Sequence, residues 1–149
     1  MTPSAGRAAA RARQARLGGP ALALALAALL LLGCGGVRAA DLFIVTRTGP
    51  QGQRLTLLVD EEGGASCNGG AMRKISDPQL VLARGIQEEL HDAASRNRSF
   101  PAQPKSVFSY RVRDEAGTVT FADNAAGQPK VLRQLALFVL QVSQQVCGL

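Results

Sequence analysis

The sequence has few of the side chains on which catalysis and nucleic-acid binding depend. It contains no tryptophan, one tyrosine, five phenylalanines and a single histidine, His91, among 149 residues. Single-stranded nucleic acids are bound by stacking their bases on aromatic side chains in a basic groove, so this composition argues against that class of function. Histidine is also the most frequent general base and metal ligand. A single copy leaves little material for either kind of site.

The positive charge of the chain is concentrated at its N-terminus. The formal net charge is +6, from 17 basic and 11 acidic residues. Five of the basic residues precede Ala40, so 12 remain against all 11 acidic residues, and residues 40–149 carry a net charge of +1. These charges are interspersed and form no basic stripe that could follow a phosphate backbone. We therefore expect no nucleic-acid partner.

The first 39 residues are predicted to be an export signal. Four arginines precede the segment 21–32, an unbroken run of twelve alanines and leucines. A cationic segment followed by an apolar run of about 7–15 residues is typical of secretory signal peptides. A membrane-spanning helix needs about 20 apolar residues, and Gly33 and Arg38 interrupt the run too early. A permanent N-terminal membrane anchor is the alternative.

Two ways of processing this signal are compatible with the sequence. Val37-Arg38-Ala39 fits a small-x-small cleavage site, which would make residues 1–39 the signal peptide and residues 40–149 one globular domain. Leu31-Leu32-Gly33-Cys34 instead resembles a bacterial lipobox, which would make residues 1–33 the signal and Cys34 the lipidation site. Either way we expect an exported protein, extracellular or a membrane-anchored lipoprotein. It would contact the membrane only through the signal or lipid anchor.

Apart from Cys34, the chain has two cysteines, Cys67 and Cys147. Neither belongs to a Cys-x-x-Cys pair or has a neighbouring histidine, so a thiol nucleophile or a metal ligand is the weaker alternative. In oxidising compartments such a pair normally forms a disulfide. We therefore predict a disulfide between Cys67 and Cys147.

The hydrophobic pattern of residues 40–149 predicts an α+β fold. Strand-like segments at 42–47 and 54–60 flank a Gly/Pro turn, and a second alternating pair at 107–113 and 118–122 flanks another turn. A helix is predicted between the two pairs and another after the second. This β-β-α-β-β-α order favours an antiparallel four-stranded sheet with two helices on one face.

The two helices have recognisable starts. In Ser76-Asp77-Pro78, Asp77 can cap the free amides and Pro78 fits the first helical turn. Leu82, Ile86, Leu90 and Ala93 then recur at helical spacing, and Gly85 is expected to permit close approach to the sheet. The second helix runs from Pro129 to about Val146. Its apolar surface exceeds one face, and we expect most of it to be buried, with a surface for a partner as the alternative.

No motif indicates catalysis or a cofactor. His91 follows Glu88 at helical spacing, but carboxylate metal sites in helical bundles need such a pair twice. Ser66 lies outside a Gly-x-Ser-x-Gly elbow, and the glycines at 63, 64, 69 and 70 lack the Lys-Ser/Thr of a phosphate-binding loop. A Cys67–His91 catalytic pair would require the disulfide to be absent. We predict no enzyme activity, no catalytic residue, no metal and no cofactor.

Residues 107–140 resemble part of a known family. Phe108-x-Tyr110-x-Val112, a tight turn, Val119-x-Phe121-x-Asp123 and a terminal leucine-rich helix are similar to the closing half of emfourin-like proteins. Those are small α+β inhibitors of thermolysin-type metalloproteases. The order of elements before this region also agrees, whereas the cysteine pair is not part of the family pattern. In composition the chain also resembles small exported proteins and lipoproteins of bacteria with GC-rich genomes.

These observations favour a non-enzymatic exported or lipid-anchored domain that binds a macromolecular partner at the cell envelope. The resemblance suggests a secreted protease as that partner, inhibited by a loop that enters its cleft. The polar loops at 47–54 and 95–106 are the candidates, because loops on a stable scaffold commonly carry binding function. The alternative is a carrier of a small apolar ligand held between sheet and helices; a small hydrolase is less favoured.

Overall fold

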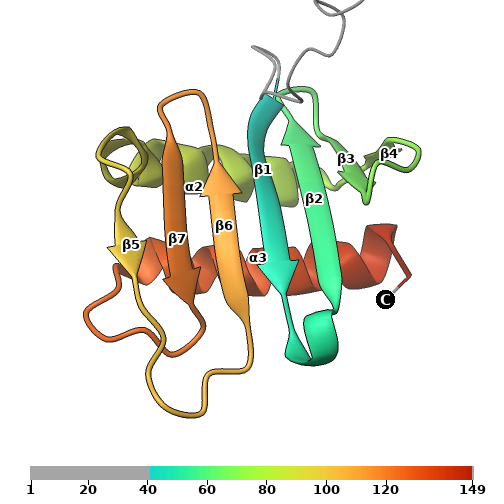
Figure 1. The fold of residues 1–149 in the computed structure, drawn as a ribbon. Helices are drawn as coiled ribbons and strands as arrows, with labels where there is room; N and C mark the ends of the chain where they lie inside the picture. Colours follow the sequence, from blue (N-terminus) through green and yellow to red (C-terminus); the bar gives the residue numbers. More distant parts are fainter. Residues whose placement is uncertain (1–40, 149) are drawn as a thin grey trace, which may run out of the picture. The chain divides into compact units, whose positions relative to one another are not determined.

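The computed structural model describes residues 41–148 and confirms the α+β class (Figure 1). The predicted export signal, its cleavage sites and Cys34 lie outside the described residues. The strands are β1 (Asp41–Thr48), β2 (Arg54–Asp60), β3 (Gly64–Cys67), β4 (Arg73–Lys74), β5 (Ser99–Phe100), β6 (Ser109–Arg113) and β7 (Thr118–Ala122). The helices are the short 3-10 turn η1 (Pro50–Gly52), α2 (Asp77–Ser95) and α3 (Lys130–Val146).

The sheet corrects the prediction of four antiparallel strands. It has seven strands in the order β4-β3-β2-β1-β6-β7-β5, and it is mixed because β5 pairs with β7 in parallel. The two predicted hairpins form its centre. The additional strands β3, β4 and β5 have only two to four residues each, which is too short for an alternating hydrophobic pattern to be recognised. They form because the chain passes alongside an existing strand edge.

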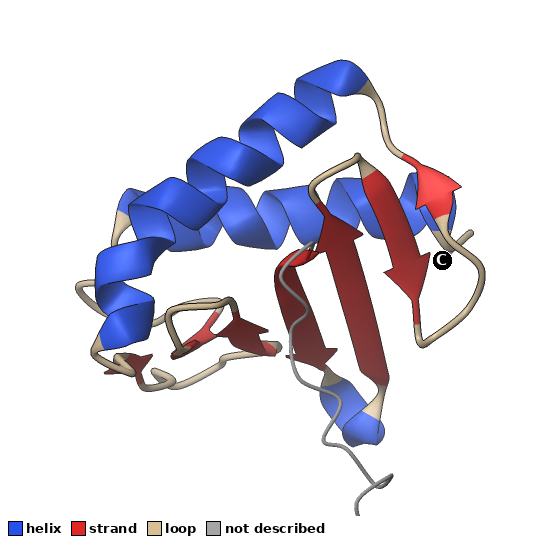
Figure 2. Ribbon diagram, turned by 90° about the horizontal axis from the view of Figure 1, so that it is seen from above, coloured by secondary structure: helices blue, strands red, loops and turns tan. Residues whose placement is uncertain are grey.

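Both long helices cover one face of the sheet (Figures 1 and 2). Strand residues alternate accordingly, so that Val45, Leu57 and Val119 are fully buried while Thr46 and Thr120 on the other face are half-buried. The aromatic rings of Phe43 and Phe138 meet edge to face between sheet and α3, with centroids 6.0 Å apart. This packing fixes α3 against the sheet.

The helix starts and stripes differ in detail from the sequence prediction. Ser76, rather than Asp77, is the N-cap of α2, and its backbone N–H donates to Gln79 Oε1 at 2.9 Å. The buried stripe of α2 is Ala83, Ile86, Leu90 and Ala94, one residue later than predicted at each end. A Cβ added at Gly85 would have no atom of residues 41–148 within 4 Å. Gly85 therefore does not serve a close approach to the sheet.

Cys67 on β3 and Cys147 after α3 form a disulfide with a Cα–Cα distance of 5.8 Å. This agrees with the prediction and joins two segments 80 residues apart. The bond ties the end of α3 to the sheet on the β3 side. None of the helices within residues 41–148 combines the length and the apolar character that crossing a bilayer requires.

Candidate functional site: the loop end and the groove beside helix α3

Three loops come together at one end of the sheet, the lower end in Figure 1. They are residues 49–53 between β1 and β2, residues 101–108 between β5 and β6, and residues 123–129 between β7 and α3. We refer to these loops together as the loop end. Their position follows from the topology, because β1, β5 and β7 all run toward this end.

Asp123 holds the second loop against the third. Its carboxylate accepts hydrogen bonds from Ser106 Oγ at 2.7 Å and from the backbone amides of Val107 and Phe108 at 3.1 and 3.2 Å. Burial alone would raise the pKa of Asp123, but these hydrogen bonds outweigh it and hold the pKa below its ordinary value. Asp123 is therefore a charged structural anchor, whose lone pairs are largely occupied.

A side-chain amide adds a second link between the same loops. Asn124 Oδ1 accepts the N–H of Gln103 at 3.0 Å, and Asn124 Nδ2 donates to the carbonyl oxygens of Gln103 and Pro104 at 3.1 and 3.0 Å. A loop tied down by several hydrogen bonds loses little further conformational entropy when it binds. Residues 101–108 are thus preorganised.

Phe108 connects the first loop to the second. The guanidinium carbon of Arg47 lies 5.2 Å from the centre of the Phe108 ring, a cation–π contact. A Cβ added at Gly49 would lie 2.9 Å from Phe108 Cε1. Glycine at this position therefore lets the first loop pack against the ring, and all three loops form one connected surface.

The tips of two loops have unusual backbone conformations. Gln51 has φ of 57° and Lys105 has φ of 70°, in the left-handed region that residues other than Gly, Asn and Asp seldom adopt. Both side chains are exposed. Such conformations cost about 1–3 kcal/mol and concentrate at functional sites, which marks these two tips as candidate contact points.

An open groove of ≈ 410 Å³ runs beside α3 from the loop end. Its polar lining residues are Arg47, Asp123, Gln128 and Arg133, and its aromatic and aliphatic lining residues are Phe108, Tyr110, Phe121, Leu132, Ala136, Leu137 and Leu140. We call it the α3 groove. Leu137 and Leu140 expose 60% and 44% of their surface, so α3 leaves an apolar strip uncovered. Most of the apolar surface of α3 is buried, as expected, and these two leucines are exceptions.

The α3 groove has a basic rim. Arg47 is half-buried and Arg133 is exposed, and within residues 41–148 neither guanidinium forms an ion pair. Tyr110 stacks on Phe121 with ring centroids 4.7 Å apart. Burial raises the pKa of Tyr110, nearby Arg47 lowers it, and Asp123 raises it. At neutral pH the hydroxyl group of Tyr110 is therefore protonated and uncharged, and it lies near the positive charge of Arg47.

A second groove of ≈ 510 Å³ lies beneath the first loop and shares Arg47 and Phe108 with the α3 groove. Its other lining residues are Gly49, Gln53, Arg54 and Leu55. The shared residues make the two grooves neighbours. An extended chain bound in one could continue into the other.

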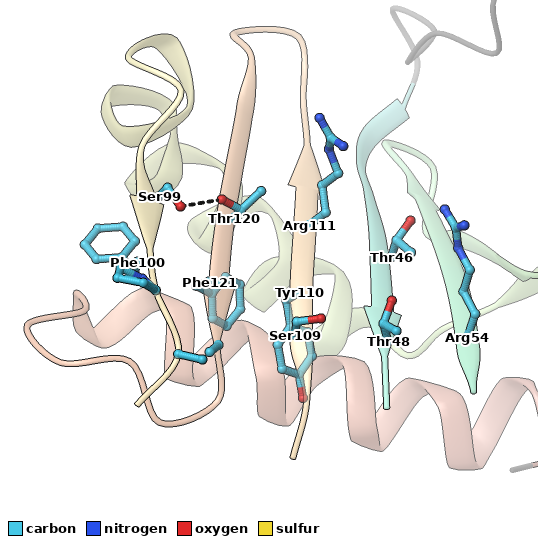
Figure 3. A pocket seen from close by; sticks show the side chains of 13 residues that line it. Thr46, Thr48, Arg54, Ser99, Phe100, Ser109, Tyr110, Arg111, Thr120 and Phe121 are labelled. Atoms are coloured by element: carbon cyan, nitrogen blue, oxygen red, sulfur yellow. Dashed lines mark hydrogen bonds between the residues drawn. The ribbon is translucent and has the colours of Figure 1, made fainter. Parts of the chain in front are cut away.

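The sheet face opposite the helices is polar. In Figure 3, Thr46, Arg111 and Thr120 lie on adjacent strands, and Ser99 and Thr120 are joined by a hydrogen bond of 2.9 Å between their hydroxyl groups. The backbone register places Thr46 opposite Arg111 and Arg111 opposite Thr120. This face presents a row of hydroxyl and guanidinium groups, in contrast to the apolar α3 groove.

The residues considered for catalysis are dispersed. Cys67 is part of the disulfide, His91 and Glu88 are exposed on α2, and Ser66 is buried on β3. Among the described residues, no three histidine, cysteine or acidic side chains are grouped closely enough to hold a metal ion. Because Cys67 is bonded to Cys147, it has no free thiol to form a catalytic pair with His91.

Of the two loops singled out in the sequence, residues 47–54 lie at the loop end, whereas residues 95–106 run from one end of the sheet to the other. The segment 47–54 and residues 101–106 meet at the loop end, whereas Asn97 lies at the opposite end, where its Oδ1 accepts the N–H of Thr118 at 3.2 Å. Arg133 and Gln128, which line the α3 groove, were not predicted as site residues. The only sequence signal for a surface there was the large number of apolar residues in the last helix. No local sequence pattern indicates that this helix lies next to Arg47.

Comparisons of the chain with protein-family models, with curated proteins and with solved structures give no match.

Proposed function

We propose that this protein is a non-enzymatic domain, exported or lipid-anchored, that binds a protein partner at the cell envelope through its loop end. The observation that carries the proposal is the convergence of three loops that are cross-linked by Asp123, Asn124 and Phe108. A rigid scaffold with preorganised loops is the usual architecture of a binding surface.

Export is part of the same proposal. The disulfide between Cys67 and Cys147 is compatible with an oxidising compartment, and the N-terminal sequence has the composition of an export signal. A lipid on Cys34 would retain the domain at a membrane surface. Removal of residues 1–39 would release it instead.

A secreted thermolysin-type metalloprotease is the partner class that the resemblance to emfourin-like proteins suggests. Protease inhibitors insert a preorganised loop and pay little entropy on binding. The strained tips at Gln51 and Lys105 have the exposure and rigidity that such an insertion requires. We therefore propose these tips as the parts that enter the cleft.

The packing gives less support to a carrier that holds an apolar ligand inside the domain. The space between sheet and helices is occupied by side chains such as Phe43, Leu57 and Phe138, each 0% exposed. A carrier needs a cavity of about 300 Å³ or more that encloses the ligand. Binding at the surface is therefore the function we favour.

The protease version is tested by inhibition of a purified thermolysin-type metalloprotease with the disulfide-bonded domain of residues 40–149. We expect inhibition, and we expect its loss when residues 50–52 or 103–105 are replaced by Ser-Gly-Ser. A Glu88→Ala/Glu89→Ala variant on exposed α2 positions is the matched control. Inhibition that survives both loop replacements would show that the loop end is not the inhibitory surface. No inhibition by the unaltered domain would exclude this class of protease.

A further inference from the structure

We infer that the α3 groove binds the C-terminal residue of a protein partner, with an apolar side chain and a free α-carboxylate. This inference rests on the proposed function, because the peptide is taken to belong to the partner that the loop end contacts. It adds the chemistry by which that partner is recognised.

The groove floor selects an apolar side chain. Leu132 is fully buried and Ala136 half-buried, while Leu137 and Leu140 are more than 40% exposed on the same helix. Covering apolar surface is favourable in proportion to the area removed from water. One leucine-sized side chain fits well within a groove of ≈ 410 Å³.

The groove rim selects a carboxylate. Arg47 and Arg133 both line it, and within residues 41–148 neither has a carboxylate partner. Guanidinium groups bind carboxylates through paired, charge-assisted hydrogen bonds. The third charged group of the lining is Asp123, whose oxygens accept hydrogen bonds from Ser106, Val107 and Phe108. Two guanidinium groups against one carboxylate leave the lining with a net positive charge for an anion.

The wall of the groove also has an unmet hydrogen-bond acceptor. Gln128 lines it, and within residues 41–148 Gln128 Oε1 is covered by protein atoms and accepts no hydrogen bond, while Gln128 Nε2 donates to the Asp123 carbonyl oxygen at 3.2 Å. A buried acceptor without a donor is destabilising. A turn of the side chain that brings Oε1 to the groove would let the N–H of a bound peptide satisfy it, whereas a fatty acid has no such donor.

A C-terminal residue carries all three groups on one Cα: an apolar side chain, a carboxylate and a backbone N–H. An internal acidic residue would have to place its carboxylate and a neighbouring apolar side chain in the same pocket. The preceding residues of the peptide can continue past Arg47 and Phe108 into the second groove beneath residues 49–55. The geometry therefore favours a chain terminus.

The test is a titration of the disulfide-bonded, ¹⁵N-labelled domain followed by its amide signals. The probes are N-acetyl-Ala-Ala-Leu with a free carboxylate, the same tripeptide as its amide, and dodecanoate. We expect the free acid to shift the signals of Phe108, Gln128 and Leu137 in a saturable way. The amide should bind at least about tenfold more weakly, since it cannot form charge-assisted hydrogen bonds with the guanidinium groups.

Variants locate the site without disturbing the fold. Arg133→Gln and Leu137→Ser change exposed residues of α3 and should each weaken binding of the free acid at least about tenfold. Arg111→Gln, an exposed arginine on the opposite sheet face, is the control and should leave binding unchanged.

Three results would overturn the inference: no saturable shifts with the free acid, equal binding of acid and amide, or binding of dodecanoate alone. The last result would indicate a lipid-binding groove. If the tripeptide fails while the loop replacements still abolish binding of a partner, the inference falls and the proposed function stands. If the tripeptide binds while the loops prove irrelevant, the proposed function falls.

Discussion

At the scale of single residues, Asp123 determines how the loop end is held. Its carboxylate accepts hydrogen bonds from one hydroxyl group and two backbone amides of the neighbouring loop. Hydrogen bonds to a charged group are about twice as strong as those between neutral groups. The order of residues 106–108 therefore depends on the ionised form of this one side chain.

Asp123→Asn should lower the free energy of unfolding at pH 7 by about 1–3 kcal/mol, because the charged acceptor is lost. The pKa of Asp123 is lowered from its ordinary 3.8 in the folded state. Its contribution is therefore complete above about pH 4 and is lost as the pH falls through the lower, folded-state pKa. The difference is measured by urea unfolding of both proteins between pH 2 and 7. In such experiments the free energy of unfolding falls with a slope of about 1–3 kcal/mol per M urea.

The acid dependence of the unaltered protein should be steeper than that of Asp123→Asn. Glu89→Gln on an exposed position of α2 serves as the control and should keep the steeper dependence. Equal acid dependence of the Asp123→Asn variant and the parent would show that Asp123 is not the anchor described here.

Gly49→Ala should destabilise the domain by about 1 kcal/mol or more, since overpacking against a ring forces a shift. The added Cβ would lie 2.9 Å from Phe108 Cε1. In a Phe108→Ala background the same change should cost little, so the two substitutions should be coupled in a double-mutant cycle. Additive free energies of unfolding would mean that Gly49 does not pack on the ring.

At the scale of elements, long periodic segments were predictable and short ones were not. The helix predicted from Pro129 to about Val146 is confirmed as α3, with Val131, Leu135 and Phe138 among its buried residues, because many apolar residues recur at 3.6-residue spacing. Strands β3, β4 and β5 escaped prediction, since their pairing depends on a neighbouring strand edge rather than on their own pattern.

The start of α2 illustrates a local ambiguity. Both Ser76 and Asp77 are good capping residues, and the sequence alone favoured Asp77 because of the proline after it. The structure has Ser76 as N-cap, with Gln79 three residues later accepting its N–H. In the buried stripe of α2, Ile86 and Leu90 are as predicted, whereas Ala83 and Ala94 take the places expected for Leu82 and Ala93.

Gly85→Ala should stabilise α2. An added Cβ would meet no atom of the described part of the chain within 4 Å, and alanine is favoured over glycine inside a helix by about 0.5–1 kcal/mol. The free energy of unfolding should rise by that amount, as measured with urea. A decrease instead would indicate that this position contacts something absent from the described fold.

At the scale of the whole molecule, the disulfide is the feature that the sequence predicted most simply. Apart from Cys34 the chain has two cysteines, which leave one pairing between them, and the structure has Cys67 bonded to Cys147. The arrangement of the loops was not predictable in this way. Which loops share an end depends on strand order and direction, and the parallel strand β5 sends residues 101–108 to the same end as residues 49–53.

Replacing both cysteines by serine should lower the free energy of unfolding by up to about 4–5 kcal/mol, since the bond closes a loop of about 80 residues in the unfolded chain. Urea unfolding of the parent with and without reductant provides the same comparison without a substitution. Identical midpoints under all conditions would mean that the bond contributes nothing to stability.

The most direct test of the loop end as a binding surface is site-specific photo-cross-linking in the cell that produces the protein. The photoreactive residue p-benzoylphenylalanine would replace Gln51, Lys105 or, as the control, Glu89, all of which are exposed. Our expectation is that positions 51 and 105 capture the same protein and that position 89 does not. Capture from position 89 alone, or none from the two loop tips, would contradict it.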